Sequence, residues 1–209
     1  MFIRAVLLTV LCFAMLPLHA TTYTLEPDYT QGVFRWDHLG FSTPAAQVSQ
    51  GEGSLQFDPA DPLHASVQVT IPLSTLNTGV PGLDEHLRSA DFFDLSKYPV
   101  ASFKSTMVEK GEGKRLKVTG DLSIHGITKP VVLDVVMVKI GTNPRSSLPT
   151  IGFDGSAKIK RSEFGLGRFV PQVSDEITLH LITQAVEAKA YAEAKRAEAA
   201  EEAAKSRKQ

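Results

Sequence analysis

The sequence predicts an all-β fold built mainly from antiparallel strands. Short runs in which apolar and polar residues alternate recur from Tyr23 onward, and Gly, Pro, Asn and Asp separate them. In residues 64–71 and again in residues 116–125, almost every second residue is apolar while its neighbours are polar. Such alternation gives a strand one buried and one solvated face, as antiparallel sheets have.

About eight strands are expected from this pattern. The eight runs that predict them are residues 33–40, 47–57, 64–71, 100–109, 116–125, 131–140, 150–160 and 176–186, and a short run at residues 23–25 precedes them. A sheet of this size forms a sandwich or closes into a barrel, and the interior of an eight-stranded barrel is filled by side chains or holds one small ligand. The alternation alone does not decide between these forms.

Residues 1–20 have the pattern of a secretory signal peptide. Arg4 precedes an apolar run over residues 5–16, and Ala20 precedes polar Thr21. The run is shorter than the roughly 20 residues that span a bilayer. We therefore expect cleavage after Ala20, a barrel domain over residues 21–186 and secretion of the mature chain. Because Leu18 stands where a small residue is preferred, an uncleaved anchor remains an alternative.

Composition excludes several classes of site. Cys12 is the only cysteine of the 209 residues and lies in the predicted signal peptide, so the mature chain has no disulfide, thiol nucleophile or cysteine-ligated zinc. The formal net charge is −1, which gives no support to a nucleic-acid partner, because phosphate binding draws on a basic surface.

Two segments depart from the strand pattern. Residues 72–93 contain helix-like turns at 74–77 and 83–89, which predict either a lid over one end of the barrel or a surface excursion. Residues 187–209 are rich in Ala, Glu and Lys and hold no Leu, Ile, Phe, Gly or Pro. This composition favours a helix but supplies no apolar stripe to dock it, so we expect a solvated helical tail.

No catalytic or metal site is evident. Five of the six histidines follow residue 20, and none forms a pair at metal-ligand spacing. The sequence has no GxSxG nucleophile elbow, and its GxG triplets read as turns or bulges. We predict a protein that is not an enzyme and has no cofactor. A lipid-modifying enzyme that uses His38 or His86 is the less favoured alternative.

Large apolar side chains are expected on the inner face of the sheet. The inward positions of the alternating runs include Phe34, Trp36, Phe57, Phe103, Met107, Leu133, Met137 and Phe153. They form either a close-packed core or the wall of a dry cavity that holds an acyl or isoprenoid chain. Periodicity cannot separate these two interpretations.

Four ordered motifs resemble the YceI-like family. They are residues 38–43 (HLGFST), 84–94 (DEHLRSADFFD) with Tyr98, Pro99 and 103–105, 120–130 (GDLSIHGITKP), and 161–165 (RSEFG). The resemblance covers residues 23 to 186. It implies an extended lipocalin-like barrel in the periplasm, a bound polyisoprenoid such as a quinone tail or prenyl phosphate, and neither metal nor catalytic residues. A link to envelope stress responses is a looser implication.

These observations lead to one functional hypothesis. We expect a carrier of a long isoprenoid lipid or quinone, in which the apolar residues named above and Phe92 hold the chain while His38, His86 and Arg88 orient its head group. A non-ligand envelope protein-interaction module is the alternative. Transient contact with a membrane and pairing of two barrels are further partner interactions that the sequence leaves open.

Overall fold

The computed structural model describes residues 20–207, so the predicted signal peptide lies outside the described part. Ten strands form one antiparallel sheet in the order β1-β4-β5-β6-β7-β8-β9-β10-β2-β3. Their bounds are β1 Thr21–Leu25, β2 Gln31–Arg35, β3 Ala45–Val48, β4 Glu52–Phe57, β5 Ser66–Pro72, β6 Val100–Lys110, β7 Arg115–Ile124, β8 Ile127–Thr142, β9 Pro149–Lys160 and β10 Glu176–Glu187.

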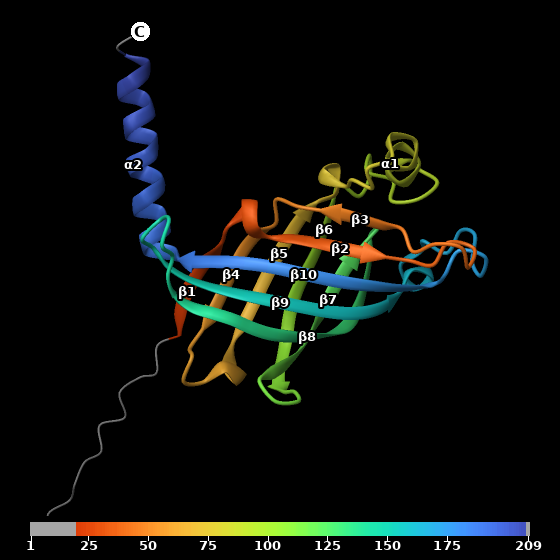
Figure 1. Cartoon of the computed structure of the whole chain (residues 1–209), viewed down its shortest axis with the longest axis horizontal. Coiled ribbons are helices and arrows are strands. Elements are labelled where there is room, and N and C mark those ends of the chain that lie inside the picture. Colours follow the sequence, from red (N-terminus) through yellow and green to blue (C-terminus); the bar gives the residue numbers. More distant parts are fainter. Residues whose placement is uncertain (1–19, 208–209) are drawn as a thin grey trace, which may run out of the picture.

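Strand β10 closes the sheet into a barrel and carries two additional strands (Figure 1). Its last residues pair with β1, with Tyr23 opposite Glu187 and Leu25 opposite Ala185. Residues 178–182 of the same strand pair instead with β2, which pairs in turn with β3. The result is a closed eight-stranded barrel that β2 and β3 extend at one end. The predicted all-β, lipocalin-like barrel is confirmed, and the sandwich is excluded.

The predicted strand over residues 47–57 is divided in two. Strand β3 ends at Val48, and β4 begins at Glu52. Gln50 between them has a φ of 61°, a left-handed conformation that a strand does not contain. Gly51 follows, and its amide donates to the carbonyl of Thr30. The chain therefore leaves the extra pair β2–β3 here and enters the closed barrel.

A β-bulge reverses one predicted side-chain direction. The register between β6 and β7 shifts between Ser105 and Met107. A bulge adds one residue to a strand, so the side chains beyond it exchange faces. Val108 is consequently buried, whereas Met107 is 50% exposed. The expectation that Met107 points inward is wrong for this reason.

Helices occupy the segments where the sequence predicted them. The insertion holds the 3₁₀ turn η3 (Leu73–Thr75) and α1 (Pro81–Arg88), and the tail forms α2 (Ala188–Ser206). Helix α2 projects from the end of the barrel opposite α1, and none of its side chains is buried (Figure 1). Between residues 20 and 207, no helix combines the length and apolar character needed to span a bilayer.

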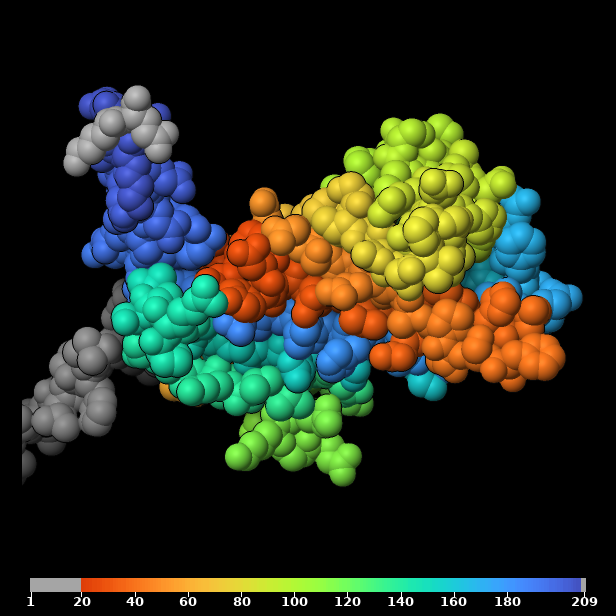
Figure 2. All heavy atoms as spheres, turned by 45° about the horizontal axis from the view of Figure 1, so that its top comes forward, coloured from red at the N-terminus to blue at the C-terminus, as the bar shows by residue number. Residues whose placement is uncertain are grey.

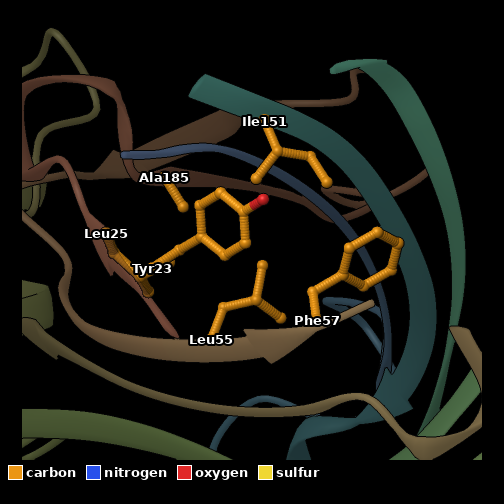
Figure 3. Close-up of a cluster of buried hydrophobic side chains, with 6 residues drawn as sticks. All are labelled: Tyr23, Leu25, Leu55, Phe57, Ile151 and Ala185. Atoms are coloured by element: carbon orange, nitrogen blue, oxygen red, sulfur yellow. The ribbon is translucent and has the colours of Figure 1, made fainter. Parts of the chain in front are cut away.

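A compact apolar cluster fills the end of the barrel near α2 (Figure 3). Its members are Tyr23, Leu25, Leu55, Phe57, Ile151 and Ala185. Ile151 and Ala185 are completely buried, and the ring of Phe57 meets Phe153 edge to face at 5.5 Å. This packing fills the α2 end of the barrel with buried apolar side chains.

Candidate functional site

The barrel interior is hollow beside the packed cluster. A cavity of about 140 Å³, here called cavity one, is enclosed by strands of the closed barrel. Its wall is largely apolar and includes Leu25, Leu55, Phe57, Val67, Val69, Phe103, Val108, Val118, Leu133, Val135 and Phe153. Three hydroxyl groups on the wall are engaged with the protein. Thr30 and Thr183 bond each other at 2.7 Å, and the Ser105 hydroxyl accepts from the Val67 amide at 2.8 Å.

A larger cavity of about 300 Å³, here called cavity two, lies toward α1. Strands β2 and β10, helix α1 and the loop of residues 165–173 contribute to its wall. The lining includes Phe34, Trp36, His38, Leu73, Leu83, His86, Leu87, Phe92, Phe93, Arg161, Phe164, Leu166, Phe169 and Leu179. Aromatic side chains are prominent, and the rings of Phe34 and Trp36 lie 6.0 Å apart.

The two cavities adjoin. Ile71 and Leu181 line both of them, so these side chains stand at the boundary. Ligand sites in proteins measure about 300–1,000 Å³ and are mostly apolar with a few polar groups. Cavity two reaches that range by itself, and cavity one extends it into the barrel. The interior is thus a hollow apolar site and not a filled core.

The mouth of cavity two is identified by the exposure of its lining. His38 and Phe169 are exposed, whereas most of the other lining side chains are buried or half-buried. His86 packs against Phe92 with ring centroids 5.2 Å apart and against Phe169 at 6.2 Å. An aromatic group from α1, the segment after it and the loop of residues 165–173 therefore borders the opening.

Arg161 anchors the loop that carries Phe169. Its side chain is buried, and it donates to four backbone carbonyls: those of Leu166, Arg168, Val173 and Ser174. Burial lowers the pKa of the guanidinium, and the charge of Asp175 partly opposes this change. A guanidinium presents donors in several directions at once, which suits it to hold a loop that turns around it.

Side-chain bonds fix α1 over cavity two. The Asp84 carboxylate accepts from the amide of Thr78 at 2.7 Å and from its hydroxyl at 2.6 Å, and these bonds lower the pKa of Asp84. Arg88 donates to the carbonyl of Leu76. Leu83, His86 and Leu87 of α1 line the cavity, so the helix forms part of its wall. This location favours the lid interpretation of the insertion over a surface excursion.

The structure distributes the predicted ligand-binding residues over both cavities. Cavity one receives Phe57, Phe103, Leu133 and Phe153, and cavity two receives Phe34, Trp36, His38, His86 and Phe92. Arg88, Met107 and Met137 line neither cavity. Met137 is 38% exposed and lies next to an irregularity in the pairing of β8 with β9.

Sequence reasoning missed several lining residues. Phe169 and Leu166 lie in a loop without periodicity, so only its glycine and proline content marked it as irregular. Arg161 and Phe164 stood in a recognised motif, but alternation gave no sign that they face a cavity.

The five histidines of residues 20–207 lie on separate segments of the fold. His180 is exposed, and His64 is exposed and bonded to Asp61 at 2.6 Å. His125 lies in the β7–β8 turn with a φ of 52° and packs edge to face on Tyr98. Over residues 20–207, no group of three or more His, Cys, Asp or Glu side chains is arranged to hold a metal ion. The arrangement is suited to bind an apolar molecule.

Comparison with known proteins gives consistent results. The model of the YceI-like domain matches residues 23–185. Protein YceI of Escherichia coli O157:H7 is 36% identical over 156 residues, which cover 75% of this chain and 81% of that protein. BcnA of Burkholderia cenocepacia superposes with a TM-score of 0.66 at 25% identity, over 74% of this chain and 95% of BcnA.

A more distant structure shares the fold. The polyisoprenoid binding domain from Saccharophagus degradans, implicated in plant cell wall breakdown, gives a TM-score of 0.62 at 15% identity. The match covers 81% of this chain and 99% of that domain.

Proposed function

The chain belongs to the YceI-like family, and we propose that it is a periplasmic carrier that holds one long isoprenoid-type lipid inside its barrel. The observation that carries the proposal is the pair of adjoining apolar cavities, which share Ile71 and Leu181. An elongated chain of apolar units fits such an interior better than a compact polar metabolite does. The domain from Saccharophagus degradans binds polyisoprenoids in the same fold, which supports this ligand class.

Burial of the chain supplies the affinity in this proposal. Each Å² of apolar surface removed from water contributes about 25 cal/mol, so a long chain in a dry cavity needs few hydrogen bonds. The head group stays near the mouth of cavity two, where His38 and His86 are available to contact it. Both a quinone and a polyprenyl phosphate have such a polar head on an isoprenoid chain, and we propose these two classes.

We propose the periplasm as the location because charged, apolar and small residues follow one another in residues 1–20 as in a secretory signal peptide, which predicts export. A carrier in that compartment moves or sequesters a lipid that is insoluble in water. A part in the envelope stress response is compatible with this role. In this proposal the protein binds its lipid without making or breaking bonds in it.

Native mass spectrometry with lipid extraction, on protein purified from its own cell envelope, tests the proposal. We expect one polyprenyl species per chain, whose fragmentation separates a quinone from a phosphate. Trp36→Ala removes a ring from the wall of cavity two, and Phe103→Ala removes one from the wall of cavity one. Both variants should bind the extracted lipid more weakly. If the protein is purified without a bound lipid and does not bind added polyprenols, the carrier function is contradicted and a protein-interaction module is favoured.

A further inference from the structure

Three large apolar side chains are exposed beside the mouth of cavity two. Phe41 is 90% exposed, and Leu39 and Phe169 are each 49% exposed. They lie on two loops, residues 36–44 and 165–175, at the end of the barrel opposite α2 (Figure 2). Phe169 itself lines the cavity, so the exposed apolar surface is continuous with the cavity wall.

The two loops are built as one unit. The amide of Leu39 donates to the carbonyl of Gln172 at 3.2 Å, and the amide of Ser174 donates to the carbonyl of Asp37 at 3.0 Å. The Asp37 carboxylate accepts from the Gly40 amide at 2.8 Å. Leu39 and Phe169 have φ values of 61° and 66°, which bulky residues rarely adopt. Specific bonds thus support a loop conformation that presents apolar side chains to solvent.

The two loops carry little unpaired charge with which to attract a partner. Within residues 36–44 and 165–175, the single Arg or Lys is Arg168, and its guanidinium is paired with Asp91 at 2.6 Å. Asp37 is engaged with Gly40 and Asp175 with Ser162. The driving force for any contact at this tip is therefore apolar, and a partner with a strongly charged surface gains little from it.

We propose that Leu39, Phe41 and Phe169 insert into a lipid bilayer and set the mouth of cavity two against it. Apolar side chains at a loop tip can reach the boundary between head groups and acyl chains. An isoprenoid chain then passes between the bilayer and the cavity without crossing water. The inference rests on the proposed carrier function and adds the surface from which the lipid is taken or to which it is delivered.

The small size of the tip favours a bilayer over a second protein. A stable protein interface buries about 800 Å² on each partner and involves roughly 20–30 residues a side. The three exposed apolar side chains supply only a small part of such an area. A fluid bilayer needs no complementary shape, so a few inserted side chains give a reversible attachment that suits a carrier.

Flotation with phosphatidylcholine vesicles tests the proposal. The full chain should float with the vesicles to an extent that added salt does not reduce. Phe41→Ser should lower the vesicle partition coefficient by at least about tenfold, because a Phe side chain loses its burial in the lipid. Val138→Ser is the matched control: Val138 is 61% exposed but lies in β8, outside the two loops, and this variant should float like the unmodified protein.

Emission of Trp36, the only tryptophan, separates docking from cavity binding. Farnesol added without vesicles should change the emission equally in the unmodified protein and in Phe41→Ser, because Phe41 does not line the cavity. Farnesol binding without flotation, or equal flotation of Phe41→Ser, would overturn the docking proposal. Flotation without any Trp36 response would instead count against the proposed function, and with it against the transfer route.

Discussion

The ring of Phe103 packs directly against Gly120 on the neighbouring strand. A β-carbon at Gly120 would stand 2.7 Å from Cε2 of that ring and 2.5 Å from the backbone oxygen of Lys104. Both distances are shorter than real contacts of a β-carbon. Since Phe103 lines cavity one, the missing side chain at residue 120 sets how far the ring reaches into the cavity.

Gly120→Ala should therefore destabilise the barrel and reduce ligand binding. We expect a loss of about 1–3 kcal/mol in the free energy of unfolding, the range found for overpacked cores, because the Lys104 backbone cannot move freely. The displaced Phe103 ring should also lower the affinity for a long polyprenol. Urea unfolding and Trp36 emission measure the two effects.

Gly152→Ala is the control for this variant. Gly152 also lies in a barrel strand, but the nearest atom to its added β-carbon is 3.9 Å away. This variant should lose no stability. Equal stability of the two variants would show that the contact between Phe103 and Gly120 does not constrain the cavity.

Leu181→Phe tests whether the two cavities act as one site. Leu181 lines both cavities, so a larger ring there should obstruct the passage between them. We expect the affinity for a long polyprenol to fall while the affinity for the short farnesol is largely kept. Leu181→Met keeps the side-chain volume and should bind both ligands normally. A parallel loss of both ligands would contradict a continuous chain-binding interior.

Alternation predicted the inner face only where a strand continues without interruption. Leu55 and Phe57 of β4 and Val118 of β7 point inward as their period requires. Met107 does not, because the bulge at Ser105 shifts every later side chain of β6 by one position. No residue type near Ser105 signals a bulge. The sequence therefore does not reveal that the side chains of β6 change faces at this position.

The conformation of the loop of residues 165–173, at the mouth of cavity two, could not be predicted from the sequence for another reason. Arg161 is buried only because the carbonyls of residues 166–174 turn toward it. That path depends on the folded loop, and no local period encodes it. Alternation therefore predicted an all-β sheet and most of its inner wall, and the resemblance to the YceI-like family predicted the closed barrel. The opening and its supports emerged only from tertiary structure.

Arg161→Lys should release this loop. A lysine ammonium is a single point of donation and cannot reach four carbonyls that lie in different directions. We expect a loss of about 3 kcal/mol or more in the free energy of unfolding, because buried carbonyls lose their donors. Amide hydrogen exchange over residues 165–174 should accelerate more than exchange in β7.

Arg168→Lys is the matched control for Arg161→Lys. Arg168 is half exposed and pairs with Asp91 at the surface, so this change should cost no more than about 1 kcal/mol. Comparable losses in the two variants would argue that Arg161 has no special anchoring role.

The attachment of α1 should depend on pH through Asp84. Because bonds from Thr78 lower the pKa of Asp84, its carboxylate stabilises the fold above the ordinary pKa of about 3.9. That stabilisation is lost as the pH falls through the lower pKa of the folded state. Thr78→Val removes the hydroxyl that donates to Asp84 and should destabilise the protein at pH 7. The difference should shrink in strong acid to the contribution of the bond from the Val80 amide to the same hydroxyl.

Unfolding curves of Thr78→Val and the unmodified protein, recorded across this pH range, provide the measurement. Thr106→Val is a suitable control, since the Thr106 hydroxyl donates to a backbone carbonyl and involves no carboxylate. A Thr78→Val difference that stays constant with pH would exclude Asp84 as the titrating partner.

Removal of residues 192–209 should leave both the barrel and its ligand binding intact. No side chain of α2 is buried, and the ion pair of Lys195 with Glu198 is exposed. Exposed pairs contribute little, so the free energy of unfolding should change by no more than about 0.5 kcal/mol. Polyprenol affinity measured from Trp36 emission should also be unchanged, which would separate the carrier function from any interaction through the tail.

The cut must fall beyond β10 for this experiment to be informative. Removal from Gln184 onward would also delete Ala185 and Val186, which are completely buried, and the pairing of β10 with β1 that closes the barrel. We expect that longer deletion to prevent folding. If the chain without residues 192–209 folds but no longer binds polyprenol, the tail takes part in lipid binding and the barrel alone is not the carrier.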